Sequence, residues 1–328
     1  AWMRQSAGRK EPFLCYLPLA AAHGPLFVPE RYREPYREQK PAVASFFGMI
    51  ANIDENIGQL DAFLRDAGLH EKTILIFMTD NGTATGDPVF NAGMRGKKIA
   101  LYEGGHRVPF FIRWPAGNLR AAGDIDALAQ AQDVLPTLLE LCGVPKPAQV
   151  KFDGTSLAGL LRGHASAWAD RKLVIQFSRM NDSKPKKGDA VVLWQRWRLV
   201  AEKELYDLAT DPAQARNVID RFPEVAASLR EHYARWWAGV EPRVNEISPI
   251  HIGSERENPI LLTPCDWVDV FFDQQAQVRR AKKNGAWAVF VEREGDYEFS
   301  LRRWAVEADA PITAGMPAYK GTDGTFAA

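Results

Sequence analysis

Residues 73–82 read TILIFMTDNG, and this stretch decides the fold more than any other part of the sequence. Its first seven residues form a short apolar run without helical periodicity, which is typical of a strand buried on both faces. Similar runs occur at 12–20 (PFLCYLPLA) and at 108–114 (VPFFIRW). Between the first two runs, from Pro41 to Gly68, apolar residues recur every three or four positions and predict an amphipathic helix.

Continuous apolar strands that alternate with helices predict an α/β fold with a largely parallel sheet flanked by helices. A short helix that begins with an Asp cap is expected over 133–142, after the third strand. We assign this α/β domain to residues 1–165.

The pattern of the sequence changes after about residue 165. The runs KLVIQFS (172–178) and AVVLWQRWRLV (190–200) predict antiparallel strands, and a helix is expected over about 223–238. We therefore expect a small antiparallel α+β subdomain over 166–240.

The last part of the chain combines a linker with a second small module. Residues 241–265 are rich in Pro, Asn and Ser and are expected to form the linker. Within 266–328, apolar residues alternate on both sides of Gly295-Asp296, which predicts a hairpin in a β-rich accessory segment.

The composition excludes some classes of function. The 328 residues contain 41 Lys and Arg against 41 Asp and Glu, so the chain lacks the basic excess of a typical nucleic-acid-binding protein. No apolar run reaches about 18 residues, so no membrane span is expected. The first residues, AWMRQSAGRKEPF, do not begin with Met and lack the apolar core of a signal peptide. We therefore expect the chain to start within a longer protein.

Polar residues with metal-binding chemistry follow the strand expected at 73–79. The carboxylate of Asp80 and the amide of Asn81 are hard oxygen donors suited to Ca²⁺ or Mg²⁺. They lie at the carboxyl end of a strand, where open α/β sheets bind ligands. His23 follows the strand expected at 12–20 in the same way. By themselves, these residues equally fit an ordinary turn and a solvated histidine.

A basic pair, Lys97-Lys98, lies in a glycine-bearing loop between residues 83 and 105. Glycines let a backbone approach a tetrahedral anion closely, and lysines supply positive charge to it. A solvated basic loop is the alternative. The chain order nevertheless places His23, the Asp-Asn-Gly turn and this loop along one edge of the expected sheet, which favours a shared anion site.

Five motifs in this order resemble the type I, formylglycine-dependent sulfatases (arylsulfatases) of the alkaline phosphatase superfamily. They are FLCYLPLAAAHGP (13–25), MIANIDENIG (49–58), TILIFMTDNG (73–82), RGKKIALYEGGHRVP (95–109) and LYDLATDP (205–212). The resemblance covers about residues 10–240.

The resemblance implies a role for each candidate residue. Asp80 and Asn81 match ligands of the family's divalent cation, commonly Ca²⁺ rather than Mg²⁺. His23 matches a histidine that contacts the sulfate and protonates the leaving alcohol. Lys98 matches the lysine that binds a sulfate oxygen, with its neighbour Lys97 as the competing choice.

Arg95 and Glu103, in the same loop, are expected to hold its shape rather than to contact substrate. The resemblance also implies sulfuric ester hydrolase activity on a sulfated small molecule or a sulfated polysaccharide. It further implies a periplasmic or extracellular location.

One part of the family's site has no match in the sequence. The nucleophile of these sulfatases is a formylglycine made within a Cys/Ser-x-Pro-x-Arg motif, and the 328 residues contain no such motif. The nearest stretch, SKPKK at 183–187, lies downstream of most of the other motifs and ends in Lys. Two ligands are also few for Ca²⁺, which takes six to eight oxygens. We therefore expect this chain alone to be inactive.

Two other functions stay open. A phosphodiesterase or phosphonate hydrolase of the same superfamily shares the sheet and the metal-binding aspartate. A carbohydrate-binding role for the accessory segment is the second, since Trp287, Tyr297 and Trp304 can stack on sugars. These aromatic residues equally fit the core of a small module, which needs its large apolar residues inside.

Overall fold

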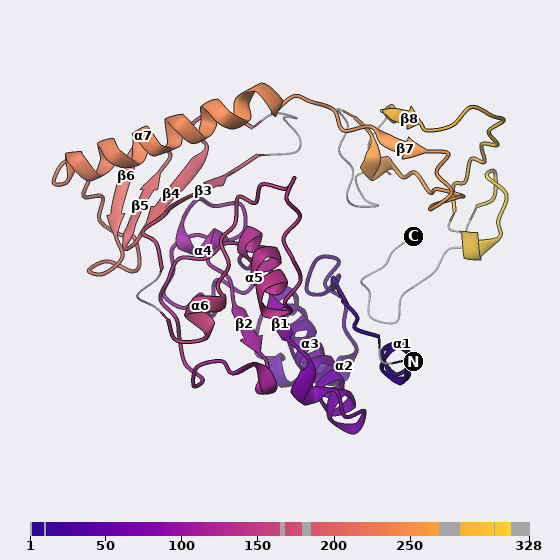
Figure 1. Ribbon diagram of the computed structural model, residues 1–328, viewed down its shortest axis with the longest axis horizontal. Coiled ribbons are helices and arrows are strands. Elements are labelled where there is room, and N and C mark those ends of the chain that lie inside the picture. Colours follow the sequence, from indigo (N-terminus) through magenta and orange to yellow (C-terminus); the bar gives the residue numbers. More distant parts are fainter. Residues whose placement is uncertain are drawn as a thin grey trace. The chain divides into compact units, whose positions relative to one another are not determined.

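The computed structural model of the protein is shown as a ribbon in Figure 1. It describes residues 2–9, 11–164, 168–178, 185–268, 283–304 and 306–315. The chain divides into two compact units, one formed by residues 1–177 and 185–240 and the other by residues 178–184 and 241–328. None of the described helices combines the length and the apolar character that a membrane crossing requires.

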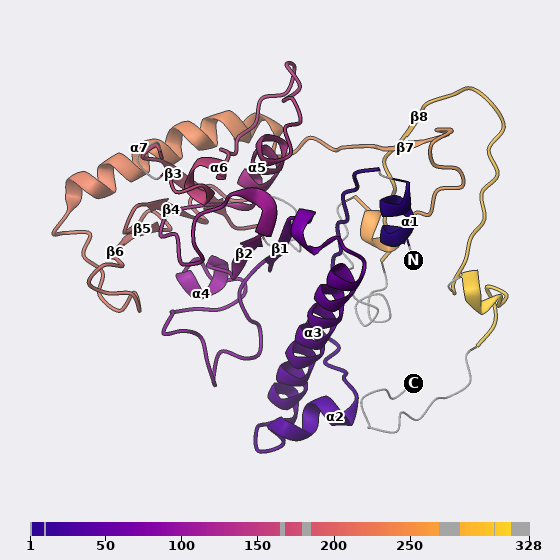
Figure 2. The same ribbon diagram turned by 60° about the horizontal axis from the view of Figure 1, so that its bottom comes forward.

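The first unit begins with helical elements. They are α1 (Trp2–Gly8), α2 (Glu30–Arg33), η1 (Glu34–Tyr36), α3 (Pro41–Asp66) and η2 (His70–Lys72). Helix α3 confirms the amphipathic helix expected from the sequence, and Pro41 is its first residue, where a missing N–H costs nothing. Gly68 follows it with a φ of 67°, the left-handed conformation that commonly ends a helix. Helix α2 packs against α3, as Figure 2 shows, and Tyr32 donates a 2.7 Å hydrogen bond to Glu55 there.

Strands β1 (Leu75–Met78) and β2 (Phe110–Arg113) form a two-stranded sheet. Both were expected from their apolar runs, but the expectation of a largely parallel sheet is wrong for the described residues. The pair is antiparallel, with Leu75 opposite Arg113 and Met78 opposite Phe110. A parallel pair needs a crossover, usually a long helix, and the connection here contains only the short helix α4 (Glu103–His106).

The prediction of a strand over 12–20 is also wrong for the described residues. This segment is extended but belongs to no sheet. Its apolar side chains Leu14, Tyr16 and Leu17 are 75%, 87% and 63% exposed. A strand exists through its hydrogen-bonded neighbour, and no described strand pairs with this segment.

Short elements connect β2 to the second sheet of this unit. They are η3 (Pro115–Gly117), η4 (Ala131–Asp133), α5 (Val134–Leu141) and α6 (Ala158–Leu161). Asp133, immediately before α5, is fully buried. Its carboxylate accepts hydrogen bonds from the Arg171 side chain and from the backbone N–H groups of Gln130 and Thr155. This buried carboxylate ties α5 to the start of the next sheet.

Four antiparallel strands form the second sheet, in the order β3-β4-β5-β6. The strands are β3 (Lys172–Gln176), β4 (Ala190–Trp194), β5 (Trp197–Val200) and β6 (Glu204–Asp207). Helix α7 (Pro223–Val240) runs along this sheet (Figure 1). The structure thus confirms the antiparallel strands and the helix of this region, but the run over 190–200 forms two strands, β4 and β5, and β6 was not predicted.

The two faces of this sheet have different neighbours. Successive residues of a strand point to opposite faces. Helix α7 is anchored to the sheet by Tyr233, which donates to Gln176, and by Ser228, which accepts from Lys172. The other face carries a buried cluster that also packs against Leu101 and Tyr102 of the loop before α4. The cluster consists of Leu173, Val191, Leu193, Val200 and Tyr206.

In the second unit, β7 (Ile250–Ile252) pairs in parallel with β8 (Val289–Val291). The described residues of this unit also form the short helices η7 (Glu241–Arg243), η8 (Pro264–Asp266) and η9 (Val306–Ala308). The hairpin expected around Gly295-Asp296 does not form, because β8 has β7 as its partner and 292–304 contains no strand. Strand β7 lies within the stretch that was expected to be linker.

Candidate functional site

The Asp80-Asn81-Gly82 turn follows β1 within two residues, as the sequence predicted. Asp80 is exposed. One of its carboxylate oxygens accepts the backbone N–H of Asn81 at 2.9 Å, and the other accepts the Asn81 side-chain amide at 2.6 Å. The turn therefore presents a carboxylate and an amide at the end of the strand, and the hydrogen bonds between Asp80 and Asn81 fix the orientation of the two side chains.

The loop that carries the two lysines lies directly against this turn. The N–H of Gly82 donates to the carbonyl of Gly105 at 3.0 Å, and the N–H of Lys98 donates to the carbonyl of Thr83 at 2.8 Å. A Cβ atom at Gly82 would lie 1.9 Å from the Gly104 carbonyl oxygen, so only glycine fits here. Two segments predicted separately from the sequence are thus brought together.

The two lysines of this loop have different surroundings. Lys97 is exposed, and its ammonium lies 3.3 Å from the carboxylate of Asp87. Lys98 is half-buried. Within the part of the chain that the structure describes, its side chain has no hydrogen bond or ion pair, so its charge is available to a ligand. This difference favours Lys98 over Lys97 as the residue that meets an anion.

His23 is exposed in the loop before α2. Its ring nitrogen Nδ1 lies 2.9 Å from the carbonyl oxygen of Gly24. No hydrogen bond or ion pair among the described residues joins His23 to Asp80, Asn81 or Lys98, so its role stays a prediction.

Arg95 fixes one flank of the lysine-bearing loop. Its guanidinium donates to the Tyr206 hydroxyl at 2.9 Å, to the Gln214 carbonyl at 2.9 Å and to the Tyr102 hydroxyl at 3.0 Å. It also stacks 3.8 Å above the Tyr102 ring. Tyr102 and Tyr206 both donate to one oxygen of Glu204.

Glu103 fixes the other flank of the loop and is only 1% exposed. Its carboxylate accepts a 2.7 Å hydrogen bond from the buried guanidinium of Arg198 in β5. Its backbone N–H donates to the side chain of Gln214 at 2.8 Å. The expectation that Arg95 and Glu103 hold the loop agrees with these contacts.

The sequence did not predict which residues of the second sheet, and of the segment that follows it, bind Arg95 and Glu103. Arg198, Tyr206 and Gln214 lie between 95 and 119 residues from the loop residues that they bind. Nothing in a strand sequence such as WRLV marks an arginine as a partner of a distant loop. Burial and the hydrogen bond to Glu204 raise the pKa of Tyr206 to about 12, so its hydroxyl keeps the proton that it donates.

The residues present fit one side of a divalent-cation site. Asp80 and Asn81 supply hard oxygen donors of the type that Ca²⁺ and Mg²⁺ prefer. The described residues contain no group of three or more His, Cys, Asp or Glu side chains arranged to hold a metal ion. The turn therefore has suitable chemistry but fewer ligands than the six to eight oxygens of a Ca²⁺ site.

Comparison with known families agrees with this arrangement. A family model described as Sulfatase matches residues 1–144, and one described as N-sulphoglucosamine sulphohydrolase, C-terminal, matches residues 93–236. Over residues 1–236 the chain is therefore similar to the sulfatase family. The two matches overlap over 93–144, which includes the loop held by Arg95 and Glu103.

Curated relatives give the same result. The chain is 27% identical to an N-acetylgalactosamine-6-O-sulfatase of Bacteroides thetaiotaomicron, over 68% of this chain and 47% of that protein. It is 32% identical to an arylsulfatase of Clostridium perfringens, over 55% of this chain and 36% of that protein. The chain thus spans at most about half the length of these two relatives.

Solved structures show the fold. The structure of Ps i-CgsB in complex with a neocarrahexaose has a TM-score of 0.61 and 22% identity, covering 72% of this chain and 52% of that one. The PsFucS1 sulfatase from Pseudoalteromonas sp. has a TM-score of 0.57 and 19% identity, covering 75% and 52%. These neighbours have the alkaline-phosphatase-like α/β fold of sulfatases.

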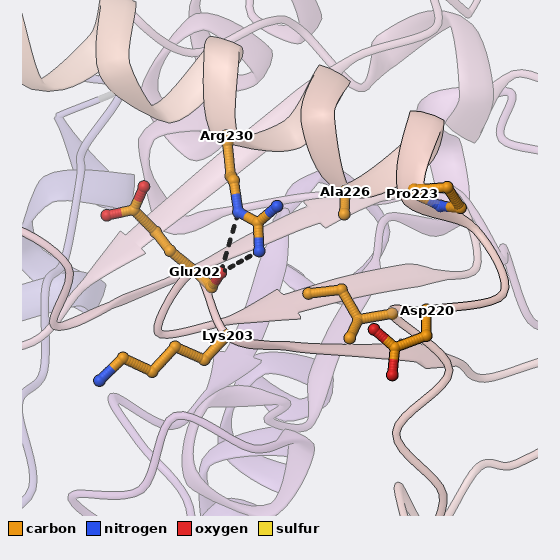
Figure 3. Close-up of a pocket in the computed structure, with 7 residues that line it drawn as sticks. Glu202, Lys203, Asp220, Pro223, Ala226 and Arg230 are labelled. Carbon is orange, nitrogen blue, oxygen red and sulfur yellow. Dashed lines mark hydrogen bonds between the residues drawn. The ribbon is translucent and has the colours of Figure 1, made fainter.

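A separate cavity of about 460 Å³ lies between the β5–β6 turn and the start of α7 (Figure 3). It is lined by Glu202, Lys203, Ile219, Asp220, Pro223, Ala226 and Arg230. Arg230 reaches toward the turn and donates two hydrogen bonds, of 3.0 and 2.7 Å, to the carbonyl of Glu202. None of the residues predicted for the sulfatase site lines this cavity.

The three aromatic residues that the sequence suggested for sugar stacking have hydrogen-bond partners in the second unit. Trp287 donates to the carbonyl of Thr263. Tyr297 donates to a backbone carbonyl four residues before it, and Trp304 to one ten residues after it. All three are half-buried. These contacts favour a structural role over sugar stacking.

Proposed function

We propose that the chain forms part of the site of a sulfuric ester hydrolase, at the surface formed by the Asp80–Gly82 turn and the loop of Lys98. The observation that carries this proposal is the direct contact between the two segments, through Gly82 to Gly105 and Lys98 to Thr83. This contact puts hard oxygen donors and an available ammonium group on neighbouring backbones.

Each residue has a defined task in this proposal. The Lys98 ammonium binds a sulfate oxygen and neutralises charge that stays on the sulfate during cleavage. Asp80 and Asn81 hold the divalent cation, which we take to be Ca²⁺ with Mg²⁺ as the second choice. When bound, that ion supplies further fixed positive charge to the sulfate oxygens. His23 donates a proton to the leaving alcohol.

The proposed substrates are sulfated glycans and small sulfate esters. The support comes from relatives, among them an N-acetylgalactosamine-6-O-sulfatase and a protein solved with a neocarrahexaose. A sulfated polysaccharide substrate also fits the periplasmic or extracellular location that we propose. The nucleophile would be the family's formylglycine. We expect the 328-residue chain alone to bind sulfate without turning over an ester, because it has no Cys/Ser-x-Pro-x-Arg motif.

Titration with inorganic sulfate in the presence of Ca²⁺ tests the site. We expect Lys98→Ala to weaken sulfate binding by about tenfold or more, the effect of losing a charge-assisted hydrogen bond. Lys97→Ala is the matched control and should change the affinity by less than about twofold, because its charge is already paired on the surface. Equal losses in the two variants would contradict the assignment of Lys98.

Two further measurements define the reaction. The first is a titration of phosphate against sulfate: a clear preference for phosphate would favour the phosphodiesterase or phosphonate hydrolase alternative. Incubation of the chain with 4-nitrophenyl sulfate and Ca²⁺ should release no nitrophenol. Turnover there would show that the chain contains a nucleophile that we have not identified.

A further inference from the structure

Two neighbouring side chains on the second sheet hold both flanks of the lysine-bearing loop. Arg198 of β5 and Tyr206 of β6 are direct cross-strand partners, so their side chains lie side by side on one face. Arg198 binds Glu103 on one flank, and Tyr206 accepts from Arg95 on the other. Lys98 lies between these two flanks in the chain.

Gln214 joins the same two flanks from a third position. Its side-chain oxygen accepts from the backbone N–H of Glu103, and its main-chain carbonyl accepts from Arg95. Gln214 is fully buried, and Arg198 is 5% exposed. Displacing these groups would leave the Glu103 carboxylate or the Arg95 guanidinium without partners, which disfavours other positions of the loop. Among the described residues, only the side-chain nitrogen of Gln214 in this network is buried without a hydrogen-bond partner.

Close backbone packing couples the position of the lysine-bearing loop to that of the Asp-Asn-Gly turn. A Cβ atom at Gly104 would lie 2.3 Å from the Gly96 carbonyl oxygen, and one at Gly105 would lie 2.0 Å from that of Ala100. A Cβ atom at Gly82 of the Asp-Asn-Gly turn would lie 1.9 Å from the Gly104 carbonyl oxygen. Backbones in such close contact cannot move independently, so a shift of Glu103 also moves Gly82 and Lys98.

We propose that Arg198, Tyr206 and Gln214 are positioning residues of the sulfate site: they set the place of Lys98 and of the Asp80–Gly82 turn from the second sheet without touching the substrate. This inference rests on the proposed function. It assigns a task in sulfate binding to the subdomain over 166–240, because a supporting shell fixes the groups that contact a ligand.

The test compares two conservative variants with a matched control in the full chain. Tyr206→Phe removes one hydroxyl from the Arg95 contact, and Arg198→Lys keeps the charge beside Glu103 but removes the Nε donor. Arg230→Lys is the control. Arg230 also binds a carbonyl of this sheet, that of Glu202, but has no contact with the lysine-bearing loop.

Two readouts separate positioning from general stability. The first is amide hydrogen exchange at Lys98 and Gly82, whose N–H groups bond Thr83 and Gly105. The second is the dissociation constant of inorganic sulfate. In Tyr206→Phe and Arg198→Lys we expect about tenfold faster exchange at these two amides, unchanged exchange in β4, and about three- to tenfold weaker sulfate binding. Arg230→Lys should leave both readouts as in the wild type.

The outcomes are distinguishable. If exchange at Lys98 and Gly82 changes only as much as exchange in β4, the positioning role is wrong, even where sulfate binding falls. If the wild type binds no sulfate, or Lys98→Ala binds it as well as the wild type does, the proposed function fails. The exchange readout then still decides whether the sheet sets the position of the loop.

Discussion

The sheet β3–β6 and the strand pair β1–β2 belong to one compact unit, and both are rich in apolar residues, yet their burial differs. Val191, Leu199 and Leu205 of the four-stranded sheet are fully buried. Phe111 of β2 is 65% exposed, and Met78 of β1 is 37% exposed. Apolar composition alone therefore predicts a strand but not the neighbours that cover it.

The connections between strands account for part of this difference. The strands β3 to β6 follow one another in the chain and pair in that order, and α7 then packs along their sheet. Strands β1 and β2 are joined by the long glycine-bearing loop, and both of their outer edges are unpaired among the described residues. The four-stranded sheet is therefore formed through connections that are local in the chain, whereas β1 and β2 pair only across the long loop between them.

Breaking one ion pair in each region should show the largest contrast. Arg198→Met removes the hydrogen-bonded partner of the buried Glu103 carboxylate and leaves only the more distant Arg107 and His106 beside it, so we expect a loss of about 3–5 kcal/mol in the free energy of unfolding. Arg113→Met removes the partner of Asp61 beside β2, where both side chains are partly exposed, and should cost about 1 kcal/mol or less. Urea unfolding measures both, and equal losses would contradict the contrast.

Truncating one apolar side chain in each region should give a somewhat smaller contrast. Leu199→Ala creates a cavity in a fully buried position and should cost about 2–5 kcal/mol. Phe111→Ala removes a larger but mostly exposed side chain and should cost about 1 kcal/mol or less. A cost for Phe111→Ala as large as that for Leu199→Ala would show that β2 is covered in solution.

Adding a methyl group at Gly82 should disturb the site more than the fold. The new Cβ atom would lie 1.9 Å from a carbonyl oxygen, so the turn and the loop must separate, at a cost of about 1–3 kcal/mol. Sulfate binding should fall with it. Gly58→Ala is the control, since nothing lies within 4 Å of that position in α3, and it should raise stability by about 0.5–1 kcal/mol.

The smallest expected effect is on the pH dependence of stability. Burial lowers the pKa of His106, and the nearby charge of Arg198 adds to this, while Glu103 opposes it. Below the ordinary value of 6.5 the unfolded chain therefore takes up a proton that the folded chain does not. The contribution of His106 to stability should be full above that pH and should decline as the pH falls below it. His106→Asn should make this decline shallower, and an unchanged slope would contradict the assignment.

The sequence predicted elements that depend on local periodicity. The helices α3, α5 and α7 and the strands β1 and β2 lie where the spacing of apolar residues placed them. The sequence did not predict the features that depend on a pairing partner elsewhere in the chain. The segment over 12–20 has the composition of a strand but no described neighbour, and the pairing direction of β1 with β2 follows from a connection without a long helix.

The candidate site shows the same limit. The order of motifs along the chain predicted that His23, the Asp80–Gly82 turn and Lys98 share one edge. The backbone contacts of Gly82 and Lys98 agree with this for the turn and the lysine, whereas no hydrogen bond or ion pair among the described residues joins His23 to them. The supporting residues were not predictable, because Arg198 and Gln214 act across about a hundred residues of chain and carry no local pattern.

The central claim is that the Asp80–Gly82 turn and Lys98 belong to one ion-binding site. Titration of the chain with a paramagnetic lanthanide in place of Ca²⁺, followed by amide NMR, tests it most directly. The account predicts that the amide signals of Asn81, Gly82 and Lys98 broaden together at the lowest lanthanide concentrations, and that Asp80→Ala abolishes this. Broadening that spares Lys98, or that persists in Asp80→Ala, would contradict it.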